Sequence, residues 1–397
     1  MGRDGSLAEL TPPSPAAKDN PAAPVPAGKK HRRAPIWAIA FVAMGAVLVL
    51  GSTVTFAGGQ FLSKRYEGSV QRDDLLGAAA PAPKDPPKVD GPLTFLVMGS
   101  DSRAGKNYDP DTRDGNAAAV AGERSDTIMV MHVPKTMDRA YVISIPRDSY
   151  VPIADKNGRP GPRNKINAAF AFGGAPRLVQ TLNNFTGSKI DYPVIVDFSA
   201  VRQITEMVGG VDVVIDKQSY DPYRFMPANT RYPTSPCRDS RYRKQRCLTF
   251  KAGPLHLDGQ LAEYYVRQRR GLPNGDLDRA KRQQQFLRSL MAKAASGDML
   301  TNPKKFDKFV RTVGGAITVD KRMPVQSLAF SLKGLRPADL VFMTLPIAGD
   351  DKIGGIGDVL IPNVAQSKEL FDAIDNGTMD QYLLKYPTAA NDVTRGS

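Results

Sequence analysis

The chain has 397 residues, of which 54 are Lys or Arg and 40 are Asp or Glu, and its formal net charge is +14. That length supplies one large domain or two ordinary ones, and the charge favours anionic partners: nucleic acid, phospholipid headgroups or phosphorylated substrates. The histidines, His31, His132 and His256, are scattered, which argues against histidine-based catalysis.

A membrane anchor is expected near the N-terminus. Residues 1–33 are rich in Pro, Ala and charge and lack an apolar period, which predicts a disordered cytoplasmic tail. No charged residue lies between Arg33 and Lys64, and this run is too long for a cleavable signal, so we expect a transmembrane helix at 34–62. The basic cluster at 29–33 keeps the N-terminus in the cytoplasm by the positive-inside rule. Everything after Lys64 would then lie outside the cell, which excludes nucleic acid as a partner.

The remainder of the chain divides by composition. A Pro- and Ala-rich linker at 63–91 is expected to hold the folded domain away from the bilayer. The extracytoplasmic domain is predicted at 92–385 and a C-terminal tail at 386–397. Strand-like and helix-like segments alternate along the domain, so the predicted class is α/β, with a mixed central sheet between helical layers.

Three short apolar runs open the domain and are predicted strands, at 94–98, 127–133 and 140–145. The second and third are expected to form a hairpin. In antiparallel strands the start of one strand lies beside the end of its partner. Asp126, at the start of the second strand, and Arg147, after the third, should therefore meet at one sheet end. Asp101 joins them if the first strand is also antiparallel to the second.

The two aspartates at that sheet end are the best metal candidates. Mg²⁺ is a hard cation that takes few protein oxygens and completes its shell with water and phosphate. Asp101 and Asp126 therefore suit Mg²⁺, or Mn²⁺, that holds a diphosphate. The alternative is structural: Asp101 caps a turn, and Asp126 pairs with Arg124.

The only two cysteines bracket a very basic loop within a polar insertion expected at 218–251. Because Cys237 and Cys247 would be exported, where oxidation is possible, a disulfide that pins this loop is the preferred interpretation. A pair of free thiols is the alternative. A zinc site is disfavoured, because the two cysteines have no histidines nearby.

The segment 264–285 carries most of the remaining chemistry. Gly and Pro interrupt it, so one helix should end near Val266 and another begin at Asp276. Arg267 and Arg269 would point the same way in an extended segment and form one clamp. One face of the second helix, at positions i, i+3 and i+4, carries Arg279, Arg282 and Gln283. That face continues into apolar residues and suits a ligand with an anionic head and an apolar tail. The alternative is a solvated basic turn before a core helix.

Five sequence blocks follow one another in the domain. They read GSDSR at 99–103, RSDTIMV at 124–130, SIPRDSYV at 144–151, NKINAAFAFGG at 164–174 and VRQRRGLPNGDLDRAKRQQ at 266–284. Together they resemble the LytR-CpsA-Psr family of cell-wall glycopolymer ligases, from about Leu93 to Asp375. The tail, membrane helix and linker are also similar to that family. The resemblance implies an αβα fold with a long apolar pocket for a polyprenyl chain.

The same resemblance implies roles for individual residues. Asp101 and Asp126 match Mg²⁺ ligands. The implied diphosphate-binding residues are Arg124, Arg147, Arg267, Arg269 and Gln283. Positions in the motifs whose roles stay open, counted with the substrate-binding set, are Arg103, Asp148, Lys165, Asn167, Arg270, Asp276, Arg279 and Arg282. Arg270 stands where related sequences often carry His.

The implied reaction transfers a phosphoglycosyl polymer from a polyprenyl-diphosphate carrier to a hydroxyl of peptidoglycan. If water replaces the acceptor, the same site would act as a diphosphatase. Asp101, Asp126 or Asp148 could serve as the general base. The alternative function is a non-catalytic, membrane-anchored module that binds anionic wall polymer or lipid diphosphate. Carboxylates among the arginines favour the enzyme, because a binder of polyanions gains nothing from them.

Overall fold

The structure is a computed structural model, and it describes residues 70–77, 89, 91–100, 125–197, 199–227, 229–238, 242, 244–294, 302–332 and 335–391. The chain divides into two units, Met1–Pro35 and Ile36–Ser397, and every described residue belongs to the second. The predicted cytoplasmic tail and the predicted membrane helix at 34–62 lie outside the described residues. Within the described part of the chain, no helix is long and apolar enough to cross a bilayer.

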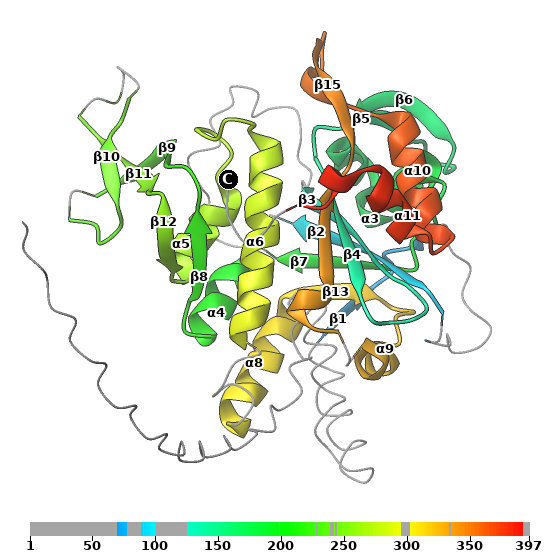
Figure 1. Ribbon diagram of the computed structural model, residues 1–397, viewed down its shortest axis with the longest axis horizontal. Helices are drawn as coiled ribbons and strands as arrows, with labels where there is room; N and C mark the ends of the chain where they lie inside the picture. The colour runs from blue at the N-terminus through cyan, green and yellow to red at the C-terminus, as the bar shows by residue number, and fades with distance from the viewer. Residues whose placement is uncertain are drawn as a thin grey trace, which may run out of the picture. The chain divides into compact units, whose positions relative to one another are not determined.

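A mixed seven-stranded sheet forms the centre of the second unit (Figure 1). Its strands, in spatial order, are β1 (Gln71–Asp73), β13 (Ile317–Asp320), β7 (Tyr192–Asp197), β2 (Leu93–Ser100), β3 (Ser125–Val133), β4 (Ala140–Ile145) and β14 (Leu340–Thr344). Strands β2, β3 and β4 are antiparallel neighbours, whereas β7 pairs parallel with β2 and β14 pairs parallel with β4. The three predicted strands and their antiparallel order are therefore confirmed.

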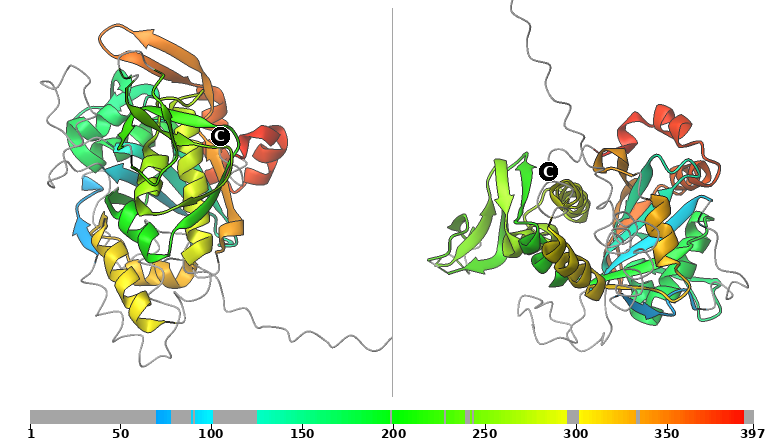
Figure 2. Two further views of the ribbon diagram at one scale, coloured as in Figure 1. Left: turned by 90° about the vertical axis from the view of Figure 1, so that its left-hand side faces the viewer. Right: turned by 90° about the horizontal axis from the view of Figure 1, so that it is seen from below.

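Helices cover both faces of this sheet (Figures 1 and 2). Successive residues of a strand point to opposite faces, so each strand contributes side chains to two separate hydrophobic cores. On β2, for example, Phe95 belongs to the first core and Leu96 to the second. The first core includes residues of α4 (Ser199–Met207), α5 (Gly259–Arg267), α6 (Asp276–Ala294), α8 (Pro303–Gly315) and α9 (Val325–Ser331). The second includes residues of α3 (Asn167–Thr186), α10 (Val364–Asp375) and α11 (Met379–Lys385). The predicted α/β class, with a mixed sheet between helical layers, is confirmed.

Local sequence explains where several helices begin and break. Within α3, Gly173 and Gly174 leave the helical conformation, and Gly174 has a φ of +63° that favours glycine. Helix α5 is capped by Asp258, whose carboxylate accepts a hydrogen bond from Leu261 N at 2.8 Å. The side chain of Asn302 caps α8 in the same way.

Shorter strand pairs lie beside the central sheet. The predicted insertion forms the three-stranded arm, which we define as β9 (Ser219–Met226), β10 (Thr234–Pro236) and β11 (Arg246–Phe250). The other pairs are β8 (Val211–Ile215) with β12 (Gly253–Leu257), β5 (Tyr150–Ala154) with β6 (Pro160–Lys165), and β15 (Ile347–Ile353) with β16 (Gly357–Pro362). Neither β6 nor β15 was expected from the sequence, because both contain residues that are depleted in strands: Pro and Gly in β6, and Gly and Asp in β15.

A disulfide joins Cys237 to Cys247, with Cα atoms 5.1 Å apart, which confirms the preferred interpretation of the two cysteines. Cys237 directly follows β10, and Cys247 lies in the neighbouring strand β11. The bond therefore closes the turn between two adjacent strands of the three-stranded arm.

Two predicted boundaries are wrong. Strand β1 lies inside the range 63–91 that was expected to be a linker, and it pairs parallel with β13. Beyond 385, where a tail was expected, short 3₁₀ turns and contacts continue: Ala390 forms a bridge with Met343, and Asn391 N donates to Phe342 O at 2.7 Å. Both segments are held by backbone hydrogen bonds to strands that are distant in sequence, and no local pattern encodes such pairing.

His132 on β3 should make the stability of the fold depend on pH. Its side chain is buried, and its Nδ1 lies 3.0 Å from Thr94 Oγ1. Burial lowers the pKa of His132 from its usual 6.5 to about 4. The unfolded chain therefore binds this proton at higher pH than the folded chain, so the free energy of unfolding should fall as the pH drops from 6.5 to 4.

The glutamine in His132→Gln does not titrate, so the fall in the free energy of unfolding at low pH should be smaller in this variant by up to about 3 kcal/mol. Urea unfolding of both proteins at several pH values measures the difference. Equal pH dependence of the two proteins would show that His132 does not cause the loss of stability at low pH.

Candidate active site

Three strand ends meet at one edge of the central sheet. Ser100, at the end of β2, pairs with Ser125 at the start of β3, and Ile145, at the end of β4, pairs with Ile128. The segments after β2 and β4 therefore leave the sheet where β3 enters it, as the sequence predicted. Asp101, Arg103 and Arg124 lie outside the described residues, and Asp126 is described only as part of strand β3.

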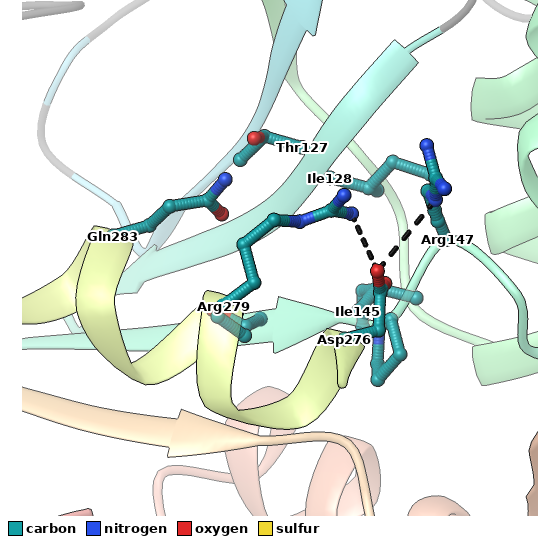
Figure 3. A pocket seen from close by; sticks show the side chains of 10 residues that line it. Thr127, Ile128, Ile145, Arg147, Asp276, Arg279 and Gln283 are labelled. Carbon is teal, nitrogen blue, oxygen red and sulfur yellow. Dashed lines mark ion pairs between the residues drawn. The ribbon is translucent and has the colours of Figure 1, made fainter. Parts of the chain in front are cut away.

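A small pocket opens beside this edge, between β3, β4 and the first two turns of α6 (Figure 3). Its walls include Thr127, Ser144, Arg147, Asp276, Arg279 and Gln283. Most of the side chains that line it end in polar groups, so the pocket suits a compact polar group.

Asp148 forms ion pairs with cationic side chains from three segments of the chain. Its carboxylate is buried, and its Oδ1 lies 3.1 Å from Lys165 Nζ. Its Oδ2 accepts a hydrogen bond from Arg269 Nη2 at 2.8 Å and lies 3.8 Å from Arg147 Nε. Because both oxygens are engaged, Asp148 suits the positioning of these cations better than the removal of a proton.

Asp276, the first residue of α6 and part of the pocket wall, also lies close to three cationic side chains. Its Oδ1 lies 2.8 Å from Arg279 Nη2, 3.5 Å from Arg269 Nε and 3.6 Å from Arg147 Nε. Figure 3 shows Arg147 and Arg279 directed toward this carboxylate. A negative charge in the first turn is also favourable to the helix. Arg147 and Arg269 therefore bridge the two buried aspartates.

The described part of the site has more positive than negative charge. Four cationic side chains, Arg147, Lys165, Arg269 and Arg279, surround two carboxylates, which leaves a surplus of two positive charges. Arginine presents planar, fork-shaped donors that match the oxygens of carboxylate or phosphate groups. The site is therefore suited to bind a multiply charged anion such as a diphosphate.

Arg267 and Arg269 do not form the predicted clamp in an extended segment. Arg267 is instead the last residue of α5, and its Nη1 donates to Glu263 Oε1 at 3.2 Å, one turn earlier. The backbone becomes extended only at Gln268. The helix runs one residue further than expected, and this difference gives the two arginines different partners.

Arg282 is fully buried, which contradicts the expectation that it contacts a substrate. Its Nη2 donates to Ser219 Oγ at 2.7 Å, and its Nη1 donates to Gln268 Oε1. The guanidinium carbon lies 4.7 Å from the centre of the Tyr265 ring and 5.1 Å from that of Phe250. Burial lowers the pKa of Arg282, and neighbouring groups that include Tyr265 partly offset this effect.

The geometry of α6 explains this correction. Adjacent residues on an α-helix are separated by about 100° around its axis. Helix α6 lies between the central sheet and the three-stranded arm (Figures 1 and 2). Gln283 therefore faces the pocket, whereas Arg282 faces Ser219 at the base of the arm.

Three other residues predicted to bind substrate, Asn167, Gln283 and Arg270, have different surroundings. The backbone N of Asn167 donates to Arg147 O at 3.2 Å, and Gln283 Nε2 donates to Val266 O at 3.1 Å. Both residues therefore support the backbone of segments that carry arginines. Arg270 is exposed on the connection between α5 and α6.

Polar contacts that no sequence pattern predicted hold α6 against its neighbours. Gln284 Nε2 donates to Ser144 Oγ at 2.7 Å and to Met343 O at 2.8 Å, and Gln285 Nε2 donates to Val214 O at 2.9 Å. A signal was present in the run RQQQ. Four consecutive polar residues point around most of a helix, and once buried, each requires a partner.

Among the described residues, no group of three or more His, Cys, Asp or Glu side chains could hold a metal ion. Asp148 and Asp276 are engaged by cations and are poor candidates. Of the pair predicted to bind magnesium, Asp101 lies outside the described residues and the side chain of Asp126 is not described, so this pair stays a prediction.

One protein family matches most of the chain: the model of the LytR_cpsA_psr family matches residues 60–374. The probable cell wall biosynthesis protein LcpB of Corynebacterium glutamicum is 33% identical over 281 residues, 70% of this chain and 60% of LcpB. TagU of Bacillus subtilis, named polyisoprenyl-teichoic acid–peptidoglycan teichoic acid transferase, is 29% identical over 59% of this chain and 63% of TagU. The chain thus spans about three fifths of the length of these relatives.

The fold is also similar to solved structures. The crystal structure of B. subtilis TagV superposes with a TM-score of 0.53 and 24% sequence identity. The superposition covers 74% of this chain and 99% of the TagV chain. This likeness supports the arrangement of the central sheet and its helical layers.

Arg282→Met should lower the free energy of unfolding, because it removes the donor of buried hydrogen bonds to Ser219 Oγ and Gln268 Oε1. Ser219 Oγ can still donate to Gln268 Oε1, which lies 3.4 Å away, so the loss should correspond to about one unsatisfied buried group, roughly 1–3 kcal/mol. Arg282→Lys should show a smaller loss, because one charged donor remains. Arg288→Met, a half-buried arginine on the same helix, is the control. Denaturant unfolding gives the free energy of unfolding of the wild type and the three variants. An unchanged free energy for Arg282→Met would contradict the stabilising role of Arg282.

Proposed function

Because the chain belongs to the LytR-CpsA-Psr family, we propose that it is a membrane-anchored phosphotransferase of the cell wall. It would transfer a phosphoglycosyl polymer from a polyprenyl-diphosphate carrier to a hydroxyl of peptidoglycan. The observation that carries this proposal is the surplus of positive charge around Asp148 and Asp276, beside a pocket at the sheet end. The name of the relative TagU describes a substrate and an acceptor of this kind.

In the proposed reaction, the arginines bind the diphosphate before any bond changes. Arg147, Arg269 and Arg279 are held by the two buried aspartates, so little reorganisation is needed when charge develops on the phosphoryl oxygens. Phosphoryl transfer depends mostly on such positioning and charge stabilisation. The site's ordered cations therefore supply the main catalytic contribution expected of this chain.

The bond changes balance as follows. The acceptor hydroxyl oxygen forms a bond to the phosphorus on the glycan side, and the bond from that phosphorus to the bridging oxygen breaks. Polyprenyl phosphate leaves with the electron pair. The hydroxyl proton passes to Asp101, to Asp126 or to solvent, because Asp148 is engaged by cations. Water in place of the hydroxyl would give a diphosphatase reaction.

Asp101 and Asp126 are proposed to hold Mg²⁺, or Mn²⁺ in its place. When bound, such an ion supplies positive charge to the diphosphate oxygens that these carboxylates cannot bind themselves. The support is the register of β2 and β3, which pairs Ser100 with Ser125, the residues next to these two aspartates in the sequence.

The proposal includes a pocket for the polyprenyl chain and an anchor at 34–62 that leaves the domain outside the cell. The support for the anchor is the long uncharged run in the sequence. Each buried CH₂ group contributes about 0.8 kcal/mol, so a prenyl chain would add affinity that a diphosphate alone lacks.

Arg269→Ala should lower the turnover number for polymer transfer about a hundred- to thousandfold. Removing one donor to a transferring phosphoryl group typically costs about 2.7–4 kcal/mol of transition-state stabilisation. Arg269→Lys should recover only part of the rate, because an ammonium group lacks the fork. Release of polyprenyl phosphate from a labelled donor measures the reaction, and exposed Arg202→Ala on α4 is the control. A wild-type rate in Arg269→Ala would favour the alternative, an anchored binding module.

Asp126→Ala should abolish transfer, for a reason different from that of the Arg269→Ala loss. It removes one carboxylate from the proposed Mg²⁺ site, so added Mg²⁺ should restore part of the rate if Asp101 still binds the ion. Added Mg²⁺ should not rescue Arg269→Ala, because the missing group is a hydrogen-bond donor. The measurement is polymer transfer across a Mg²⁺ titration for both variants. Equal rescue of the two would refute this division of roles.

A further inference from the structure

A second basic cluster lies outside the pocket, at the end of the three-stranded arm. Between the two cysteines the sequence RDSRYRKQR holds five cationic residues and one aspartate, so its net charge is five minus one, or +4. Like charges gathered in a turn raise the local positive potential and attract anions. The proposed phosphoryl transfer uses none of these residues.

Two of these cations, Arg238 and Arg246, are held in place by contacts with the arm. The Arg238 guanidinium carbon lies 4.7 Å from the centre of the Tyr220 ring on β9. Arg246 Nε donates to Thr234 Oγ1 at 2.6 Å, and its Nη2 donates to Thr234 O at 2.9 Å. Arg238, Lys244 and Arg246 are nevertheless exposed. Because the disulfide and these contacts order the cations in advance, an anion would bind with a smaller loss of entropy.

The three-stranded arm is continuous with the proposed diphosphate site. Gly271, in the connection between α5 and α6, has a φ of +80°, and a Cβ there would lie 1.9 Å from the carbonyl oxygen of Tyr220. The connection therefore runs directly against β9. Buried Arg282 also joins Ser219, the first residue of β9, to Gln268. A polymer whose hydroxyl enters the pocket could thus extend onto the arm.

The side chains of the arm favour a polymer over a membrane surface. Binding to a membrane interface combines cations with large apolar side chains that enter the headgroup region. In the described part of the chain, the exposed large hydrophobic residues are Phe172, Val214, Val364 and Leu384, and none lies in the arm.

We propose that the three-stranded arm binds the peptidoglycan acceptor through the carboxylates of its peptides. This inference rests on the proposed function, which makes peptidoglycan the acceptor. The cations of the turn would hold an anionic strand next to the pocket and so raise the local concentration of acceptor hydroxyl groups. The arm would thereby select the acceptor, whereas the arginines around Asp148 and Asp276 bind the donor.

The test measures binding of muramidase-released peptidoglycan fragments to the full-length protein in neutral detergent. The arm variant carries Arg238→Gln, Lys244→Gln and Arg246→Gln. An exposed ion pair contributes up to about fivefold in affinity, so three losses should weaken binding on the order of tenfold. Added salt should reduce the difference between the arm variant and the wild type.

The control variant removes the same charge from exposed lysines elsewhere, with Lys135→Gln, Lys156→Gln and Lys352→Gln. It should bind fragments as the wild type does. If the arm variant loses its disulfide or its melting temperature falls, the single change Lys244→Glu at an exposed position replaces it and should also weaken binding.

Fragments whose carboxylates have been amidated should bind the wild type as weakly as native fragments bind the arm variant. Equal affinity for native and amidated fragments, or equal loss in the control variant, would overturn the proposal. So would binding of the arm to phosphatidylglycerol vesicles without binding to fragments. None of these binding measurements needs the polyprenyl-linked donor, so a negative result would reject the role of the arm without rejecting the proposed transfer reaction. Absence of transfer by the wild type would reject the proposed function itself.

Discussion

Two buried carboxylates hold the basic site together. Four cationic side chains lie around Asp148 and Asp276, and without these carboxylates they would repel one another. The carboxylates reduce that repulsion and orient the guanidinium planes. Because the cations outnumber them by two, positive charge remains for a ligand. Order and net charge together are what electrostatic stabilisation of a transition state requires.

Helix α6 connects this site to the rest of the domain. One side of the helix presents Arg279 and Gln283 to the pocket, and another places Arg282 against Ser219 at the base of the three-stranded arm. A buried guanidinium group is costly to desolvate, yet its planar fork can tie several segments together at fixed angles. Arg282 thereby links the helix, the arm and the segment that precedes Arg269.

Some features could be predicted because they depend on local patterns. Short apolar runs separated by turns predicted β2, β3 and β4, and their antiparallel order brought the ends of β2 and β4 beside the start of β3. Prediction failed for β1, β6 and β15, which are polar and pair through backbone groups. It also failed at the end of α5, where one additional helical residue gives Arg267 a partner different from that of Arg269.

The sequence by itself determined the α/β class, the convergence of three strand ends, the cysteine-bearing insertion and the basic character of the segment 264–285. Those properties follow from apolar periods, turn residues and charge, which are all local. Only the tertiary structure decided which polar residues of α6 face the pocket, because a helix between two partners buries more than one side. It also decided that Asp148 organises the arginines, since its bond to Arg269 joins residues 121 positions apart, and only the folded chain brings such groups together.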